Sequence, residues 1–154
     1  MSCQTISMCN NSPIQSISPK INLVQEALLL TDIDTRYNQP IDKLTKLANV
    51  VNNSYINDNL YLFLWNTKGE NIAHGRFPQL SGKGSVLCEQ QLNNMIIAVN
   101  NILTPSILQN GILTVIQNSF YFGRQVSYPW VNNTIKISYV VSINIGDGIY
   151  ILGA

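Results

Sequence analysis

Two aromatic residues and a lysine near the end of the sequence carry its clearest chemical signal. Tyr128 and Trp130 lie two apart, so their side chains share one face of a β-strand. Lys136 lies beyond an Asn-Asn turn, on the next strand of an otherwise apolar run. A buried ammonium without a partner costs several kcal/mol or loses its proton. A ligand carboxylate would remove that cost, with the aromatic rings supplying shape and desolvation. The pattern therefore predicts a pocket for a small anion.

The same residues have a simpler interpretation. Lys136 could lie on a solvated face, with Tyr128 and Trp130 packed in the hydrophobic core. The two interpretations differ in where the ammonium points. An inward ammonium over a cavity supports the pocket, and an ammonium in bulk water rules it out.

Catalytic and metal motifs find little support. His74 is the single histidine, and no Gly-x-Ser-x-Gly elbow accompanies it, so a hydrolase using His74 is the weakest of three hypotheses. The run SGKGS lacks the spacing of a phosphate-binding loop. Cys3, Cys9 and Cys88 match no zinc pattern, and we expect reduced thiols. We predict no enzyme activity, no metal and no cofactor.

Composition points to one globular domain. The chain has 154 residues, of which 45% are hydrophobic and 11% charged, with a net charge of +1. Scattered basic residues exclude a phosphate-binding stripe, so no nucleic-acid partner is expected. No secretory signal and no apolar run of membrane-spanning length is visible, which favours a cytoplasmic location.

The order of elements predicts an α+β fold. Residues 1–19 form a loose tail, and residues 20–154 form the domain. Helical spacing begins at Ile21 and is broken at 38–40, and a second helix covers 41–56. A hairpin follows at 60–75, then an irregular loop, a helix over 86–103 and a short helical segment opened by Pro105. Residues 111–123 fit either a strand or a helix. Three antiparallel strands complete the domain.

The sequence motifs resemble those of single Cache sensor domains, the extracytoplasmic modules of many bacterial chemoreceptors and sensor kinases. In NTKGENIAHGRFPQLSGKG, the turn at 66–69, Ala73-His74, Pro78 and Gly82-Lys83 follow the family pattern, although Gly75 stands where proline is usual. Downstream, Gly123, Tyr128-Pro-Trp130, Lys136 to Val140 and GIYILGA keep the family order. The resemblance covers about residues 20–154.

The resemblance implies a PAS-like five-stranded antiparallel sheet backed by a long N-terminal helical region. It also implies pocket residues, carried over by position. These are His74, Tyr128, Trp130, Lys136 and Tyr139, with Trp65 and Arg124 as further candidates. Lys136 and Tyr139 are three residues apart, so a regular strand points them to opposite faces. Either a bulge brings both to one pocket, or Tyr139 has a structural role.

We therefore expect a soluble sensor domain that binds a small organic ligand, a carboxylate or an amino acid. The alternative is a structural or interaction protein with the same fold and no working pocket. A homodimer or a separate signalling partner would supply the output that this sequence does not show. Family members usually face the cell exterior, which conflicts with the cytoplasmic location favoured above.

Overall fold

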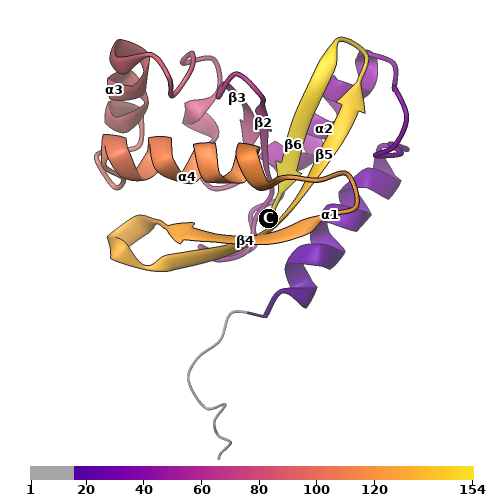
Figure 1. Ribbon diagram of the computed structural model, residues 1–154, viewed down its shortest axis with the longest axis horizontal. Coiled ribbons are helices and arrows are strands. Elements are labelled where there is room, and N and C mark those ends of the chain that lie inside the picture. The colour runs from indigo at the N-terminus through magenta and orange to yellow at the C-terminus, as the bar shows by residue number, and fades with distance from the viewer. Residues whose placement is uncertain (1–15) are drawn as a thin grey trace, which may run out of the picture.

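The fold is α+β, with a five-stranded antiparallel sheet between two layers of helices (Figure 1). A computed structural model describes residues 16–154. The helices are α1 (Ser18–Leu30), α2 (Asp42–Asn52), α3 (Glu89–Ala98) and α4 (Pro105–Asn118), with short 3₁₀ turns at Pro78–Leu80 and Val131–Asn133. The strands are β2 (Phe63–Asn66), β3 (Asn71–His74), β4 (Arg124–Pro129), β5 (Ile135–Ile145) and β6 (Gly148–Gly153).

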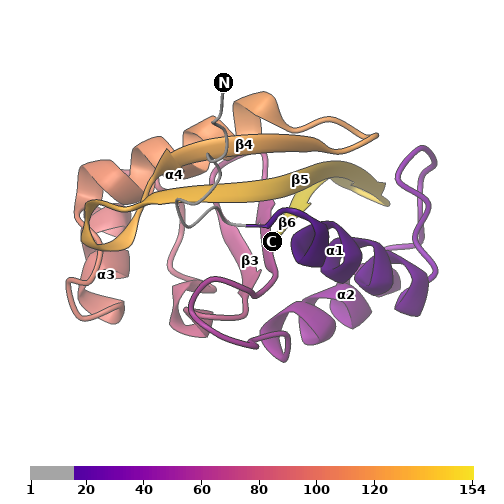
Figure 2. The same ribbon diagram turned by 90° about the horizontal axis from the view of Figure 1, so that it is seen from below.

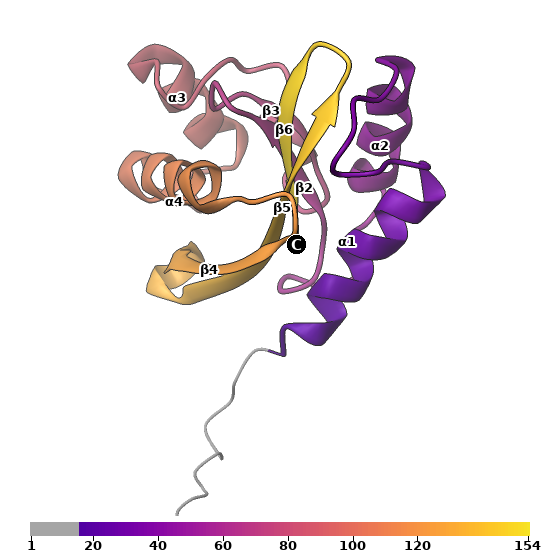
Figure 3. The same cartoon turned by 45° about the vertical axis from the view of Figure 1, so that its right-hand side comes forward.

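The strand order β3-β2-β6-β5-β4 is the PAS-like arrangement that the resemblance implied. The C-terminal strand β6 lies in the centre, between β2 and β5. Helices α1 and α2 lie side by side and cover one face (Figure 2), whereas α3 and α4 cover the other (Figure 3). The sheet therefore separates two cores, one under each helical layer.

The alternation predicted for β2 is confirmed. Tyr61, Phe63 and Trp65 belong to the core beneath α3 and α4, whereas Leu62 and Leu64 belong to the core beneath α1 and α2. All five are almost completely buried. A strand that is apolar on both faces fits a central place in a sheet with helices on both sides.

The first helix differs from its predicted bounds at both ends. It begins at Ser18, so Pro19 lies in the first helical turn, where its missing N–H costs nothing. It ends at Leu30 because Asp32 adopts a left-handed φ of 55°. Ile33 N–H then donates to Leu28 O at 2.9 Å, closing a Schellman motif. Of the predicted tail, residues 1–15 lie outside the described residues, as do Cys3 and Cys9.

Of the segment 111–123, which fitted either a strand or a helix, residues 111–118 form the second half of α4 and residues 119–123 lie beyond its end. Thr104 caps this helix by accepting the Ile107 N–H at 3.2 Å, and Pro105 occupies the first turn. Gly111 lies where α4 touches the sheet: a Cβ there would stand 3.0 Å from the Trp130 ring and 3.2 Å from the Tyr128 ring. Glycine therefore lets α4 lie directly on this aromatic pair.

The last three strands are close to prediction. Asn132 and Asn133 make the turn between β4 and β5 with φ of 57° and 59°, which Asn tolerates better than most residues. The register that follows places Tyr128 directly opposite Lys136. Within residues 16–154, none of the helices has the length and apolar character needed to cross a membrane.

Candidate functional site

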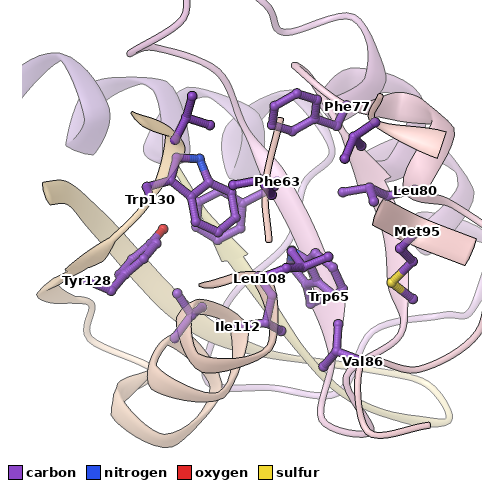
Figure 4. Close-up of a cluster of buried hydrophobic side chains, with 14 of the residues drawn as sticks. Phe63, Trp65, Phe77, Leu80, Val86, Met95, Leu108, Ile112, Tyr128 and Trp130 are labelled. Atoms are coloured by element: carbon purple, nitrogen blue, oxygen red, sulfur yellow. The ribbon is translucent and has the colours of Figure 1, made fainter. Parts of the chain in front are cut away.

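Eight side chains meet beneath α4 and enclose a small cavity. We call this group the aromatic–lysine cluster. Its members are Tyr61, Phe63, Trp65, His74, Ile112, Tyr128, Trp130 and Lys136. None of the space between them is wide enough for a water molecule. Figure 4 shows Tyr128 and Trp130 at one end of the surrounding core, Phe77 and Leu80 at the other, and Ile112 on the helix beside them.

The Lys136 ammonium points into this cluster and not into bulk water. The residue is 6% exposed, and its Nζ lies 4.3 Å from the centre of the Tyr61 ring and 5.8 Å from that of Phe63. Within residues 16–154, Lys136 Nζ has no hydrogen-bond acceptor and no carboxylate partner. Burial lowers the pKa of Lys136 well below 10.5, and the charges of Lys20 and Arg76 lower it further.

Tyr128 and Trp130 lie on the same face of the sheet, against α4. Their ring centroids are 5.5 Å apart with the planes at 89°, an edge-to-face pair. The Tyr128 hydroxyl and Ser138 Oγ share a hydrogen bond of 2.8 Å, and both side chains are buried. Burial raises the pKa of Tyr128 far above its ordinary value, so the phenol stays neutral.

His74 is a buried, neutral imidazole held from one side. Its Nδ1 accepts the backbone N–H groups of Arg76 and Phe77 at 3.2 and 2.9 Å. The proton of the neutral ring therefore lies on Nε2. Burial, followed by the charges of Lys136 and Arg76, lowers the pKa of His74 well below 6.5. Among the described residues, no hydroxyl or thiol is hydrogen-bonded to this ring.

The glycine that replaces the usual proline after His74 has a local reason. Gly75 N–H donates to Leu62 O at 2.8 Å, a bond that proline could not make. A Cβ at Gly75 would stand 2.5 Å from Ser54 Oγ and 3.0 Å from Tyr61 Cβ. Close packing of this segment on its neighbour thus excludes proline here.

The cluster has more hydrogen-bond donors than partners. The Tyr61 hydroxyl and the indole N–H groups of Trp65 and Trp130 are buried and have no hydrogen-bond partner within residues 16–154. Together with Lys136 Nζ and His74 Nε2, they make five donor groups, and none of the eight lining side chains is acidic. Burial raises the pKa of Tyr61 to about 12, against smaller opposing effects of Trp130 and Arg76. An anionic oxygen would satisfy several of these groups at once.

Sequence reasoning missed Tyr61 and Phe63, although a signal existed. Both share a strand face with Trp65, which was among the candidates. Their rings carry the two contacts to the Lys136 ammonium. Extending the period-two pattern back from Trp65 would have found them.

Two predicted candidates lie elsewhere. Strand β5 is regular between Lys136 and Tyr139, so Tyr139 points to the opposite face, toward the α1–α2 layer. Its hydroxyl donates to Phe122 O at 3.3 Å and lies against Gly123. Arg124 is exposed, with its guanidinium 5.5 Å from the Phe120 ring. Neither lines the aromatic–lysine cluster.

No group of three or more His, Cys, Asp or Glu side chains within residues 16–154 is arranged to hold a metal ion. Cys88, the one cysteine in that range, is exposed and unpaired.

Comparison with known proteins adds little. No protein-family model matches the chain, and no curated protein matches its sequence. A crystal structure of a methyl-accepting chemotaxis protein from Vibrio parahaemolyticus RIMD 2210633 superposes with a TM-score of 0.43 and 16% identity. The match covers 86% of this chain and 79% of that one. A likeness of this size carries no functional argument.

Proposed function

We propose that this domain binds a small organic anion, a carboxylate, at the aromatic–lysine cluster, and acts as a non-enzymatic sensor module. The observation that carries the proposal is the buried Lys136 ammonium, which has ring contacts and no anionic partner among the described residues. A carboxylate at Nζ would offset the cost of burying the charge. The indole and imidazole N–H groups would take its remaining lone pairs.

The size of the cavity limits the ligand. Ligand pockets usually measure about 300–1,000 Å³, whereas none of the space between these eight side chains is wide enough for a water molecule. The ligand is therefore a molecule of few heavy atoms, and the walls must move apart to admit it. Helix α4 contributes Ile112 to the wall and rests on Tyr128 and Trp130 through Gly111, so a shift of α4 would widen the cavity.

The sensor role rests on the resemblance of the motifs to single Cache domains and on the coupling that this geometry offers. Binding at the cluster would change the packing of α4 on the sheet. On the other face, Lys20 of α1 donates to the carbonyl of Ile137, the neighbour of Lys136 on β5. The two helical layers are thus connected through the strand that carries the ammonium.

A panel of small acids tests the proposal by thermal shift. Acetate, propionate, pyruvate and single amino acids are added to the full chain at constant ionic strength. A bound ligand raises the melting temperature with concentration by mass action. Lys136→Met and Trp130→Phe should lose the shift while retaining a cooperative transition. If no acid in the panel raises the wild-type melting temperature, the proposal is wrong.

The second candidate function is a structural or interaction protein with no working pocket. The narrowness of the cavity favours it, because none of the space admits a water molecule. Under this alternative, the buried donors and the ammonium would lower the stability of the fold and have no role in binding. The same acid panel separates the two candidates.

A further inference from the structure

A surface depression lies against the aromatic–lysine cluster, and residues 74–77 separate the two. The depression has a volume of about 740 Å³. Its walls come from the loop before β2, the segment after β3 and the turn between α3 and α4. Arg76 and Phe77 line it, and their backbone N–H groups both bond to His74, a member of the cluster.

Arg76 is the central side chain of this partition. Its side chain is 14% exposed, and its guanidinium carbon lies 4.9 Å from the Phe77 ring. The Phe77 ring in turn lies 5.3 Å from the His74 ring. Besides the effect of burial, the Arg76 charge lowers the pKa of Tyr61, His74 and Lys136. Arg76 thus lines the depression and is linked to His74 of the cluster through its backbone N–H and the Phe77 ring.

A single residue on the outside holds Arg76 in this place. Asp58 accepts from it twice: Arg76 Nη1 lies 3.2 Å from the backbone oxygen, and Nη2 lies 3.5 Å from the carboxylate. The Asp58 side chain is 65% exposed and also accepts the Tyr55 hydroxyl at 2.7 Å. An ion pair with so exposed a partner is weak, on the order of 0–1 kcal/mol. A ligand carboxylate could replace Asp58 at little cost.

We infer that Arg76 lies at the entrance to the cluster and binds an outer anionic group of the ligand. The ligand is therefore a small dianion. Its inner carboxylate pairs with Lys136 and its outer carboxylate takes the place of Asp58 on Arg76. The inference rests on the proposed function and adds a second cation to it. Lys136 and Arg76 are both largely buried, and Asp58, on the outer side of Arg76, is largely exposed, so one positive charge is available for each end of such a ligand.

The test compares monoanions with dianions. Acetate and propionate are titrated against malonate and succinate by calorimetry, at constant ionic strength, with the full chain. The dianions should bind about 10-fold or more tightly, the value of one charge-assisted hydrogen-bonded contact. Arg76→Gln should remove that advantage and leave monoanion binding within about twofold. Asp58→Asn should strengthen dianion binding, because Arg76 is freed.

Arg36→Gln is the matched control. Arg36 also pairs with a neighbouring aspartate, Asp34 at 3.3 Å, and it does not line the cluster or the depression. It should leave both affinities unchanged. Equal binding of mono- and dianions by the wild type overturns the inference and leaves the proposed function standing. The inference is also overturned if Arg76→Gln still binds dianions more tightly than monoanions, or if this variant loses the same affinity for both ligand types. Binding of neither type overturns the proposed function itself.

Discussion

Replacing Lys136 by methionine should stabilise the ligand-free protein. The substitution keeps an unbranched apolar side chain of similar length and removes the ammonium, which lies over the Tyr61 and Phe63 rings. Most substitutions of buried residues destabilise a fold. A gain here would therefore show that the lysine is retained at a cost to stability.

The magnitude follows from two limits. The protein can avoid the buried charge by releasing the proton, which at pH 7 costs at most about 5 kcal/mol for a group with a normal pKa of 10.5. The contacts with the aromatic rings stabilise the charged form by about 0.5–2 kcal/mol. We expect Lys136→Met to add about 1–3 kcal/mol to the free energy of unfolding. For about 150 residues, this raises the melting temperature by about 2–12 °C.

The gain should also depend on pH in a defined direction. Because the folded-state pKa of Lys136 is lowered, the unfolded chain binds more protons than the folded chain between that pKa and 10.5. Wild-type stability therefore rises with pH through this window and is complete above 10.5. The advantage of Lys136→Met should shrink over the same window, because the variant has no such group.

The assay is urea unfolding of both proteins at constant ionic strength from pH 6 to pH 10. Lys46→Met is the control, since Lys46 is exposed on α2 and should change stability by less than about 0.5 kcal/mol. A loss of more than about 1 kcal/mol in Lys136→Met would refute the reasoning. It would mean that the ammonium has a favourable partner in the folded protein.

Three further predictions concern the surroundings of the cluster. Below pH 6.5, His74 is protonated in the unfolded chain but stays neutral in the folded protein, so the free energy of unfolding falls by up to about 1.4 kcal/mol per pH unit. In His74→Asn, the amide oxygen replaces Nδ1 as the acceptor. This variant should lose less stability at acid pH than the wild type, measured by urea unfolding. Gly75→Pro should lower the free energy of unfolding by about 2–5 kcal/mol in the same assay, because it removes a backbone hydrogen bond and creates a close contact. Gly148→Ala is the control and should leave stability unchanged, because the space around Gly148 is open. Equal effects of the two substitutions would contradict the packing argument. Tyr128→Phe should lower the free energy of unfolding by about 1–3 kcal/mol, because it leaves the buried Ser138 hydroxyl without its hydrogen-bond partner. Adding Ser138→Ala should recover part of this loss in a double-mutant cycle. Strictly additive losses would count against the hydrogen bond.

Much of the sheet follows from local signals. Alternation in β2, the Asn132-Asn133 turn and the glycine turns fix the strands and their faces, because side-chain direction and left-handed backbone are local properties. The ends of the helices were harder to predict from local signals. The end of α1 depends on Asp32 in a left-handed conformation, for which glycine is the usual signal.

The candidate site was only partly visible in the sequence. The spacing of Tyr128, Trp130 and Lys136 indicates a shared face, and strand parity separates Tyr139 from them. The period-two pattern places Tyr61 and Phe63 on the face of Trp65, but their approach to Lys136, more than 70 residues further along the chain, is a tertiary contact that no local pattern reports. The narrowness of the cavity depends on how closely α4 approaches the sheet, which is a property of tertiary packing.

The protonation of Lys136 tests the central claim most directly. In protein labelled with ¹³C-lysine, the Cε resonance that is missing in Lys136→Met identifies the residue, and its chemical shift reports the pKa. Without ligand, the pKa should lie well below 10.5, and a saturating acid from the panel should raise it, because the carboxylate stabilises the charged form. An ordinary pKa near 10.5 that does not respond to any acid would contradict a buried cation whose partner is the ligand.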